Sequence, residues 1–208
     1  MKQIHFDLGF ASEYNESDFI LSLCNLDAFN SIIKNANWVN NRFLLIGEEG
    51  CGKTHLANIW KTRTNAVELC EGDVFSRASA FLIENIERIK NEEYLFHLLN
   101  HCQNNSLPLL MTAEKYPAFT LRDLNSRIKA TLSAIIKSPD EEFIRVLLHK
   151  FFAEQQLLVS EEVLDYLIAR VERNFTYLKN LTTTIDKLSL EEKRNITIPF
   201  VKEVLARV

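Results

Sequence analysis

Glycine is scarce in this sequence of 208 residues, and three of the five glycines, Gly47, Gly50 and Gly52, fall between positions 47 and 52. Flexible backbone is therefore concentrated at one site. Lysine and arginine form no continuous block and the formal net charge is −4, so we expect no extended basic surface for duplex DNA. The sequence also has no internal repeat and no low-complexity tract.

Cysteine is infrequent, and the spacing of Cys24, Cys51, Cys70 and Cys102 is not typical of a metal site. No secretory leader precedes them and no apolar run approaches the length of a membrane span. We therefore expect reduced thiols in a cytoplasmic protein without a membrane partner. Cys51 lies in the glycine cluster, where it is either an exposed thiol near a helix N-terminus or a side chain that fills space.

The glycine cluster belongs to the stretch FLLIGEEGCGKTHLANIW, residues 43–60. An apolar run suited to a buried strand precedes it, and a helical pattern follows. The pattern G-x-x-x-x-G-K-T predicts a phosphate loop (Walker A motif, residues 47–54). In such a loop backbone N–H groups and a helix N-terminus face the phosphates, a lysine reaches the β and γ positions, and a threonine hydroxyl ligates Mg²⁺. The alternative is a glycine-rich turn with an incidental lysine. The predicted nucleotide contacts here are Gly47, Gly50, Cys51, Gly52, Lys53, Thr54 and His55.

A second apolar run, FLI at 81–83, ends on Glu84 and Asn85. In P-loop proteins the strand near the phosphate loop usually ends in an acidic residue that helps to hold Mg²⁺, and many ATPases add a second that polarises water. Glu84 can hold the metal through water, or it merely caps the next helix. The amide of Asn85 cannot accept a proton, so we expect hydrolysis by this chain alone to be slow or absent.

Further strands and helices alternate along the chain. LPLLMTAEKYP, residues 107–117, is an apolar run that contains Thr112 and Glu114, two more predicted nucleotide contacts. LRDLNSRIKATLSAII, residues 121–136, reads as a helix and then another strand. Alternation predicts an α/β fold, a parallel sheet with helices on both faces and the ligand at the carboxyl ends of the strands. His97 and His101 stand four apart on a predicted helix without a third ligand, so a solvated pair is favoured over a metal pair.

The sequence divides into three predicted regions. Residues 1–18 form an N-terminal extension without sustained periodicity, and residues 19–138 form the P-loop nucleotide-binding α/β domain, entered by a helix over 25–36 with Asn25 as its N-cap. From Pro139 the pattern becomes helical without a convincing buried strand, with Ser160 and Pro199 at helix starts. Residues 139–208 are therefore predicted to be a small all-helical lid domain.

This arrangement resembles the AAA+ class, and three segments resemble the DnaA family within it. LLMTAEKYP resembles the sensor-one segment of DnaA, and LNSRI resembles the segment that carries the arginine finger. ERNFTYLKNLTTTIDKLS with ITIPFVKEVL resembles the lid of Hda/HdaA-type, DnaA-related regulators. The resemblance spans essentially the whole chain. It leaves no residues for the helix-turn-helix and helicase-loading domains of DnaA, which favours a regulator over an initiator.

In Hda-like proteins a short N-terminal peptide docks on the β sliding clamp of DNA polymerase III. QIHFDL, residues 3–8, is similar, and the resemblance implies clamp contacts by Gln3, Ile4, Phe6 and Leu8. The alternating peptide also suits an edge strand of its own domain.

The resemblance implies regulatory inactivation, in which a clamp-bound and nucleotide-bound regulator promotes hydrolysis of the ATP held by DnaA. Arg127 would then be the arginine finger, acting in trans; such fingers raise the rate by about 10³ to 10⁵. The alternative for Arg127 is a surface ion pair. The implied cofactors are ADP or ATP with Mg²⁺, bound through Thr54 and Glu84. The implied partners are DnaA and the clamp, with self-association, and DNA only through partners.

Two departures from the DnaA pattern bear on function. DnaA has two aspartates where this chain has Glu84 and Asn85, and its lid arginine is replaced by Thr176. Arg173 is either a substitute that contacts the nucleotide or part of a solvated lid face. Without the lid arginine, discrimination for a γ-phosphate weakens, so long occupancy by ADP is expected.

The predicted function is thus an Hda-like, ADP-bound regulator that prevents re-initiation of chromosomal replication. Its alternative is a DnaA-like initiation ATPase or ATP-driven switch that hydrolyses ATP itself. A pure adaptor with a vestigial phosphate loop is disfavoured, because a structural loop needs neither Lys53 nor Thr54.

Overall fold

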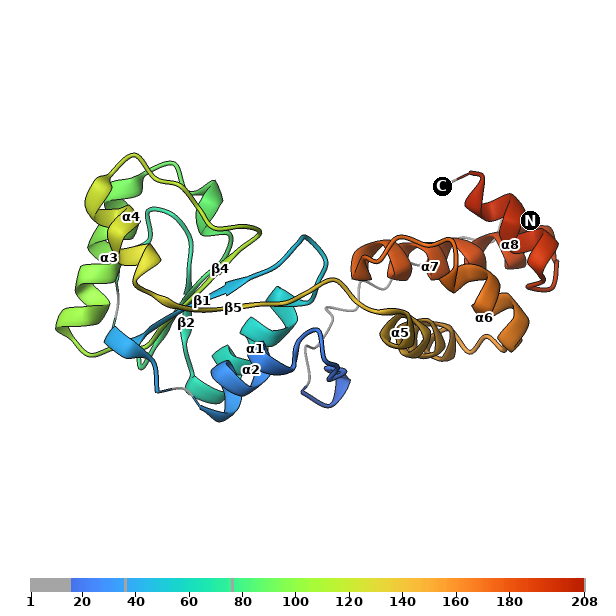
Figure 1. Ribbon diagram of the computed structural model, residues 1–208, viewed down its shortest axis with the longest axis horizontal. Coiled ribbons are helices and arrows are strands. Elements are labelled where there is room, and N and C mark those ends of the chain that lie inside the picture. Colours follow the sequence, from blue (N-terminus) through green and yellow to red (C-terminus); the bar gives the residue numbers. More distant parts are fainter. Residues whose placement is uncertain (1–15, 36, 76, 208) are drawn as a thin grey trace, which may run out of the picture.

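The computed structural model describes residues 16–35, 37–75 and 77–207. Figure 1 shows an α/β part and an all-helical part that lie side by side, joined where the chain leaves the last strand. The predicted clamp peptide, residues 3–8, lies outside the described residues.

The centre of the α/β part is a sheet of five parallel strands in the order β2-β3-β4-β1-β5. The strands are β1 (Arg42–Ile46), β2 (Val67–Leu69), β3 (Phe81–Ile83), β4 (Leu109–Ala113) and β5 (Leu132–Ile135). Every residue of β1, β3 and β4 is buried, as their continuous apolar runs require when both faces are covered. The predicted fold class is confirmed.

Helices cover the two faces of the sheet in two pairs, α1 (Leu26–Phe29) with α2 (Lys53–Thr64), and α3 (Glu92–Asn104) with α4 (Arg122–Lys129). Successive strand residues point to opposite faces, so β1 feeds two hydrophobic clusters. Leu44 packs in one cluster with side chains of α3 and α4, whereas Leu45 packs in the other with side chains of α1 and α2. The core therefore lies on both sides of β1 and directly below the phosphate loop.

The helix predicted over 25–36 is present as α1 followed by one π-helical stretch, Asn30–Lys34. Asn25 occupies the N-cap position, but the expectation that its side chain caps the helix is wrong. The side-chain oxygen accepts from the N–H of Ser22 (3.0 Å), and the amide nitrogen donates to the carbonyl of Ile20 (2.9 Å). The buried side chain of Asn25 therefore hydrogen-bonds to backbone groups of the loop before the helix, and it is not available to cap the helix.

The remaining short elements are 3-10 helices at Glu16–Asp18, Val39–Asn41 and Ile86–Arg88. The first of these falls within the segment predicted to be loosely ordered. It is held by Glu16, which accepts a hydrogen bond from Nε of Arg63 near the end of α2 (3.0 Å).

The C-terminal part consists of α5 (Glu141–Glu154), α6 (Glu161–Ile168), α7 (Phe175–Glu192) and α8 (Ile198–Leu205). It has a hydrophobic cluster of its own, to which all four helices contribute. Asp140 and Asn174 cap α5 and α7 through their side chains, and Pro199 lies in the first turn of α8. The predicted helical lid is therefore present, and the boundaries at 18/19 and 138/139 stay predictions.

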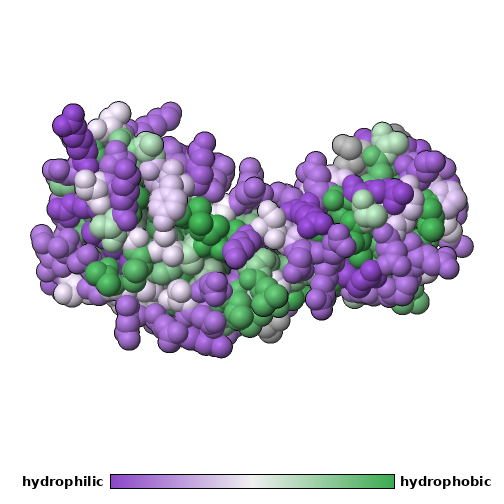
Figure 2. Space-filling view, viewed as in Figure 1, coloured by the Kyte–Doolittle hydropathy of each residue, from purple (hydrophilic) through white to green (hydrophobic). Residues whose placement is uncertain are grey.

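The strand β5 forms one edge of the sheet, and Leu132 and Ile135 are 43% and 53% exposed there. Figure 2 shows hydrophobic surface over the region where β5 runs in Figure 1. None of the helices in the described part of the chain has the length and apolarity that crossing a bilayer requires.

Candidate nucleotide site

The phosphate loop runs from the carboxyl end of β1 into α2, as the motif predicts. Gly50 and Gly52 have φ angles of +73° and +97°, a backbone region that side chains disfavour. Gly52 is also the N-cap of α2, so the loop directs the N-terminal end of a 12-residue helix toward the space above it. This end carries partial positive charge and unpaired N–H groups, which together suit a phosphate.

Lys53 is buried beneath the loop that precedes it. Its ammonium donates to the carbonyl oxygens of Gly47 (2.7 Å) and Glu48 (2.9 Å). Both partners are neutral carbonyls, so the positive charge is hydrogen-bonded but is not neutralised by an acid in these two contacts. A phosphate in the cradle would supply the missing negative charge.

Glu84, at the carboxyl end of β3, meets the phosphate loop through Thr54. The Thr54 hydroxyl donates to Oε2 of Glu84 (2.8 Å), while Oε1 is buried and has no hydrogen-bond partner among the described residues. Burial raises the pKa of the Glu84 carboxyl, and the hydrogen bond from Thr54 opposes this shift. A hydroxyl beside a carboxylate with an unused oxygen is an oxygen donor set that fits Mg²⁺, which a bound nucleotide would bring. The residues present therefore fit the cofactors that the motif implies.

Asn85 follows in a left-handed conformation, with φ of +53°. Its backbone N–H donates to the hydroxyl of Thr112 (3.0 Å), a fully buried residue of β4. Thr112 thus fixes the end of β3 relative to β4. The position next to Glu84 carries an amide in place of a second carboxylate, and an amide cannot accept a proton from water.

Between the phosphate loop and the lid lies a cavity of about 560 Å³, a size suited to a small-molecule ligand. The loop contributes Gly50, Cys51, Gly52, Lys53, Thr54 and His55 to its wall. The opposite wall comes from α5 and α7, and the segment before α1 closes a third side. Figures 1 and 2 show the narrowing between the two parts of the molecule where these walls meet.

The segment before α1 supplies aromatic and apolar surface to the cavity. The ring of Phe19 contacts the ring of His55 edge to face, with centroids 5.2 Å apart. The Lys150 ammonium of α5 donates to the carbonyl of Asp18 (2.6 Å), which holds this segment against the lid. The cavity thus has a polar end at the loop and a more apolar end near Phe19 and Phe151, as a nucleoside phosphate requires.

The first turn of α7 rests directly on the phosphate loop. The side-chain amide of Asn174 donates to the carbonyl of Glu49 (2.8 Å), and its oxygen caps α7 by accepting from the N–H of Tyr177 (2.9 Å). A Cβ atom built on Gly50 would lie 2.2 Å from the hydroxyl oxygen of Thr176. Glycine at position 50 is therefore required both by its backbone angle and by the closeness of the lid.

Five predicted nucleotide contacts do not line this cavity: Gly47, Glu84, Thr112, Glu114 and Arg173. Glu114 forms an ion pair with Arg88, and Arg173 forms an ion pair with Glu141 (3.0 Å). Arg173 instead borders a smaller hollow beside Glu48 and Ser138.

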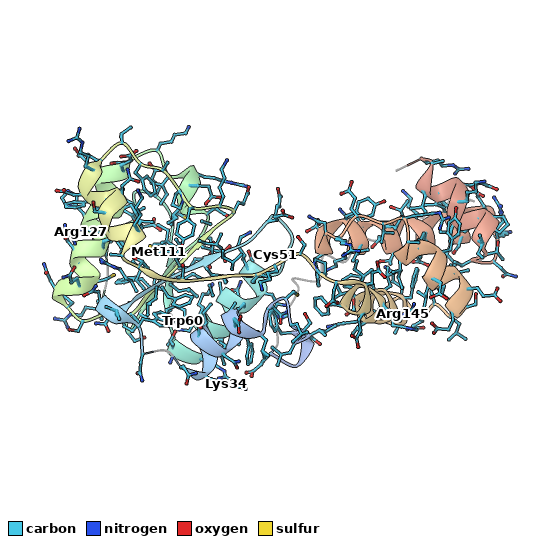
Figure 3. All side chains as sticks on the ribbon, in the orientation of Figure 1. Lys34, Cys51, Trp60, Met111, Arg127 and Arg145 are labelled. Carbon is cyan, nitrogen blue, oxygen red and sulfur yellow. The ribbon has the colours of Figure 1, made fainter. Side chains whose placement is uncertain are left out.

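Arg127 lies far from the phosphate loop. Figure 3 places it at the end of the α/β part away from the lid, whereas Cys51 of the loop lies next to the lid. Its guanidinium stacks over the ring of Phe96 at 5.0 Å and donates to the side chain of Gln103 (3.2 Å). It cannot reach the nucleotide site of its own chain from this position.

Cys51 fills space in the loop. A Cβ atom built on Gly47 would lie only 2.5 Å from the sulfur of Cys51, so the side chain packs closely against Gly47. Burial raises the pKa of the thiol. The thiol is half-buried and packs against Gly47, so the space-filling alternative is favoured over an exposed thiol. For the histidine pair, the described residues contain no group of three side chains that could hold a metal ion.

Sequence reasoning missed most of the cavity wall that lies outside the phosphate loop. These residues include Phe19, Ile20, Lys150, Phe151, Phe175 and Lys179. Phe175 adjoins Thr176, the position already singled out in the lid, so the same segment held a usable signal. The others carry no motif, and the fold alone brings them to the loop.

The sequence is similar to a lid-domain family and to replication initiators. Residues 140–205 match the family described as "Hda, lid domain". An uncharacterized protein of Haemophilus influenzae is 32% identical over 87% of this chain and 89% of its own length. The replication initiator DnaA of Buchnera aphidicola is 27% identical over 99% of this chain, which spans only 55% of that protein.

Solved structures of DnaA share the fold. Domain III of Thermotoga maritima DnaA superposes with a TM-score of 0.79 at 18% identity, covering 94% of this chain and 97% of that one. AMPPCP-bound DnaA from Aquifex aeolicus gives 0.70 at 16% identity, covering 88% and 68%.

The parallel sheet, the phosphate loop and the helical lid together define an AAA+ type of P-loop protein. With the lid match and the DnaA relatives, the chain belongs to the Hda/DnaA-related AAA+ proteins.

Proposed function

We propose that the protein is a cytoplasmic regulator of replication initiation that holds ADP. It binds the β sliding clamp through residues 3–8 and stimulates hydrolysis of the ATP bound to DnaA, which prevents re-initiation. The match to an Hda lid and the DnaA relatives support a role in replication initiation, and the clamp and DnaA as partners are the proposed part.

One observation carries the proposal: the site keeps the residues that hold phosphate, and it has an amide, Asn85, where many ATPases have a second carboxylate that polarises water. Lys53 and Thr54 are in place, and Glu84 contacts Thr54 at 2.8 Å. Asn85 occupies the position at which an ATPase would polarise water, and its backbone is tied to Thr112. Such a site retains nucleotide without turning it over quickly. The AMPPCP-bound DnaA neighbour supports a nucleotide as the ligand.

The position of Arg127 supports action on a partner. It is half-buried on the α/β part, remote from the cavity, and among the described residues its guanidinium makes one hydrogen bond of 3.2 Å and one ring contact. An arginine so placed can leave Phe96 and Gln103 to meet the phosphates of another chain. In that role it stabilises negative charge that develops during hydrolysis of the partner's ATP.

The test is a reconstitution of clamp, DNA, ATP-loaded DnaA and this protein, with ATP loss followed over time. We expect the wild type to accelerate hydrolysis of the ATP bound to DnaA. With Arg127→Ala the stimulated rate should be lower by at least about a thousandfold. Arg122→Ala, an exposed arginine on the same helix, is the matched control and should retain stimulation.

The result also separates the proposal from its alternative. ATP turnover by this protein alone, at a rate equal to that of the complete mixture, would show an ATPase in its own right and refute the regulator. Deletion of residues 1–8 should abolish binding to the immobilised clamp, and unchanged binding would remove that peptide from the proposal.

A further inference from the structure

Two lysines of the lid line the nucleotide cavity, and they differ in what they contact. Lys150 on α5 is already engaged, because its ammonium donates to the Asp18 carbonyl and lies 3.8 Å from the carboxylates of both Asp18 and Glu154. Lys179 on α7 also borders the cavity, yet in the described part of the chain its ammonium has no hydrogen-bond or ion-pair partner. Lys179 is therefore the lid cation that is available to an anionic ligand.

The helix geometry directs Lys179 toward the phosphate loop. Residues three apart lie on the same face of a helix, so Lys179 follows Thr176 on the face of α7 that meets the loop. Thr176 contacts Gly50 closely enough that a Cβ there would lie 2.2 Å from the Thr176 hydroxyl. Side chains on a helix lean toward its N-terminus, which for Lys179 is the direction of Thr176 and the loop. The three-residue rise is about 4.5 Å, which an extended lysine side chain can span.

The opposite wall places a second cation and a helix N-terminus across the same cavity. Lys53 opens α2, and Gly50 and Gly52 provide backbone that can approach a phosphate. A phosphate chain lying between Lys53 and Lys179 would be contacted from the α/β part and from the lid. The cavity wall also carries three acidic residues, Asp18, Glu49 and Glu154. Because their negative charge repels a phosphate, binding requires a cation that is not already paired with one of them.

We propose that Lys179 is the lid residue that binds the terminal phosphates of the nucleotide, and that Arg173 is not. Arg173 pairs with Glu141 and lies outside the cavity. Contact between Lys179 and a phosphate stabilises the lid against the loop, because one ligand then joins the two parts. The proposal rests on the proposed nucleotide site and adds which side chain of the lid recognises the ligand.

The test is titration calorimetry with ADP and with ATP on the full chain. Lys179→Ala should bind both with at least about tenfold lower affinity, the loss expected when a charged hydrogen bond to phosphate is removed. Lys179→Arg should restore most of the affinity because it keeps the charge. Lys187→Ala is the matched control: it removes the same charge from an exposed position of the same helix that does not line the cavity.

A second measurement uses the unaltered protein. Acetylation by an amine-reactive reagent, followed by mass spectrometry, should slow at Lys179 when ADP or ATP is added, while Lys187 reacts at the same rate with and without nucleotide. Equal acetylation of Lys179 in both states would overturn the assignment.

The outcomes separate the two proposals. If the wild type binds and Lys179→Ala binds equally well, the assignment of Lys179 is wrong and the nucleotide site stands. Equal losses in the Lys179 and Lys187 variants would indicate a general charge effect and also refute the assignment. If the wild type binds neither nucleotide, and so matches Lys53→Ala, both proposals fail.

Discussion

Replacing Gly50 by alanine tests the contact between lid and phosphate loop most directly. The φ angle of +73° is the first obstacle, and an L-residue held there costs about 1–2 kcal/mol. The second is steric, because the new Cβ would lie 2.2 Å from the hydroxyl oxygen and 2.7 Å from the Cβ of Thr176. Rotation of the Thr176 side chain can relieve the first contact but not the second. The first turn of α7 must therefore move away from the loop.

That movement breaks the hydrogen bond from Asn174 to the Glu49 carbonyl, with a net loss of about 1 kcal/mol. We expect Gly50→Ala to lower the free energy of unfolding by about 2–3 kcal/mol in total. Gly72→Ala is the matched control. Its φ is +94° and a Cβ there would meet no atom within 4 Å, so only the backbone strain of about 1–2 kcal/mol should appear.

The assay is urea unfolding followed by circular dichroism, with hydrogen exchange across residues 172–180 to locate the change. Exchange there should accelerate in Gly50→Ala and not in Gly72→Ala. The effect of Asn174→Ala should also be smaller in the Gly50→Ala background by about 1 kcal/mol, because the bond to Glu49 is already broken. Equal destabilisation by the two glycine variants, with unchanged exchange at 172–180, would refute the contact.

Two further predictions concern titrating groups at the site. Burial raises the pKa of Glu84 in the folded state above its ordinary value of 4.5. At pH values between 4.5 and this raised pKa, the folded state holds a proton that the unfolded state has lost. As pH rises through this range, the free energy of unfolding should therefore fall in the wild type and fall less in Glu84→Gln. Urea unfolding at a series of pH values measures both. The same pH dependence in the two proteins would contradict the prediction. Cys51, whose pKa burial raises, should react with iodoacetamide at least about tenfold more slowly than the exposed Cys70, measured by mass spectrometry, and equal rates would mean that the loop is open.

The α/β fold and the phosphate loop could be predicted because their signals are local. Phe43 to Ile46 form one continuous apolar run, and the lysine and glycines follow at fixed spacing, so strand, loop and helix are encoded within about twenty consecutive residues. Glu84 could be found for the same reason, since it ends a buried strand. The side-chain role of Asn25 was mispredicted, because the groups that it satisfies belong to the preceding loop.

The lid shows the limit of such reasoning. Its helices were evident from their periodicity, yet periodicity does not say which residue of a helix faces another domain. The sequence indicates Thr176 and Arg173 as lid positions near the nucleotide, and the structure places Arg173 beside Glu141 while Lys179 borders the cavity. Arg173 lies just before α7 and Lys179 lies six residues further along the chain, and only the packing of α7 on the loop distinguishes them.

By itself, therefore, the sequence determined that this protein has a parallel sheet, a cradle for phosphate without a second carboxylate at position 85, and a helical lid. Tertiary structure decided what surrounds the cradle: Asn174 on Glu49, Phe19 beside His55, Lys150 engaged and Lys179 free of partners among the described residues. The physical reason is that backbone conformation follows from neighbours in the chain. A cavity wall instead joins residues more than a hundred positions apart, and their meeting depends on how two hydrophobic cores pack against each other.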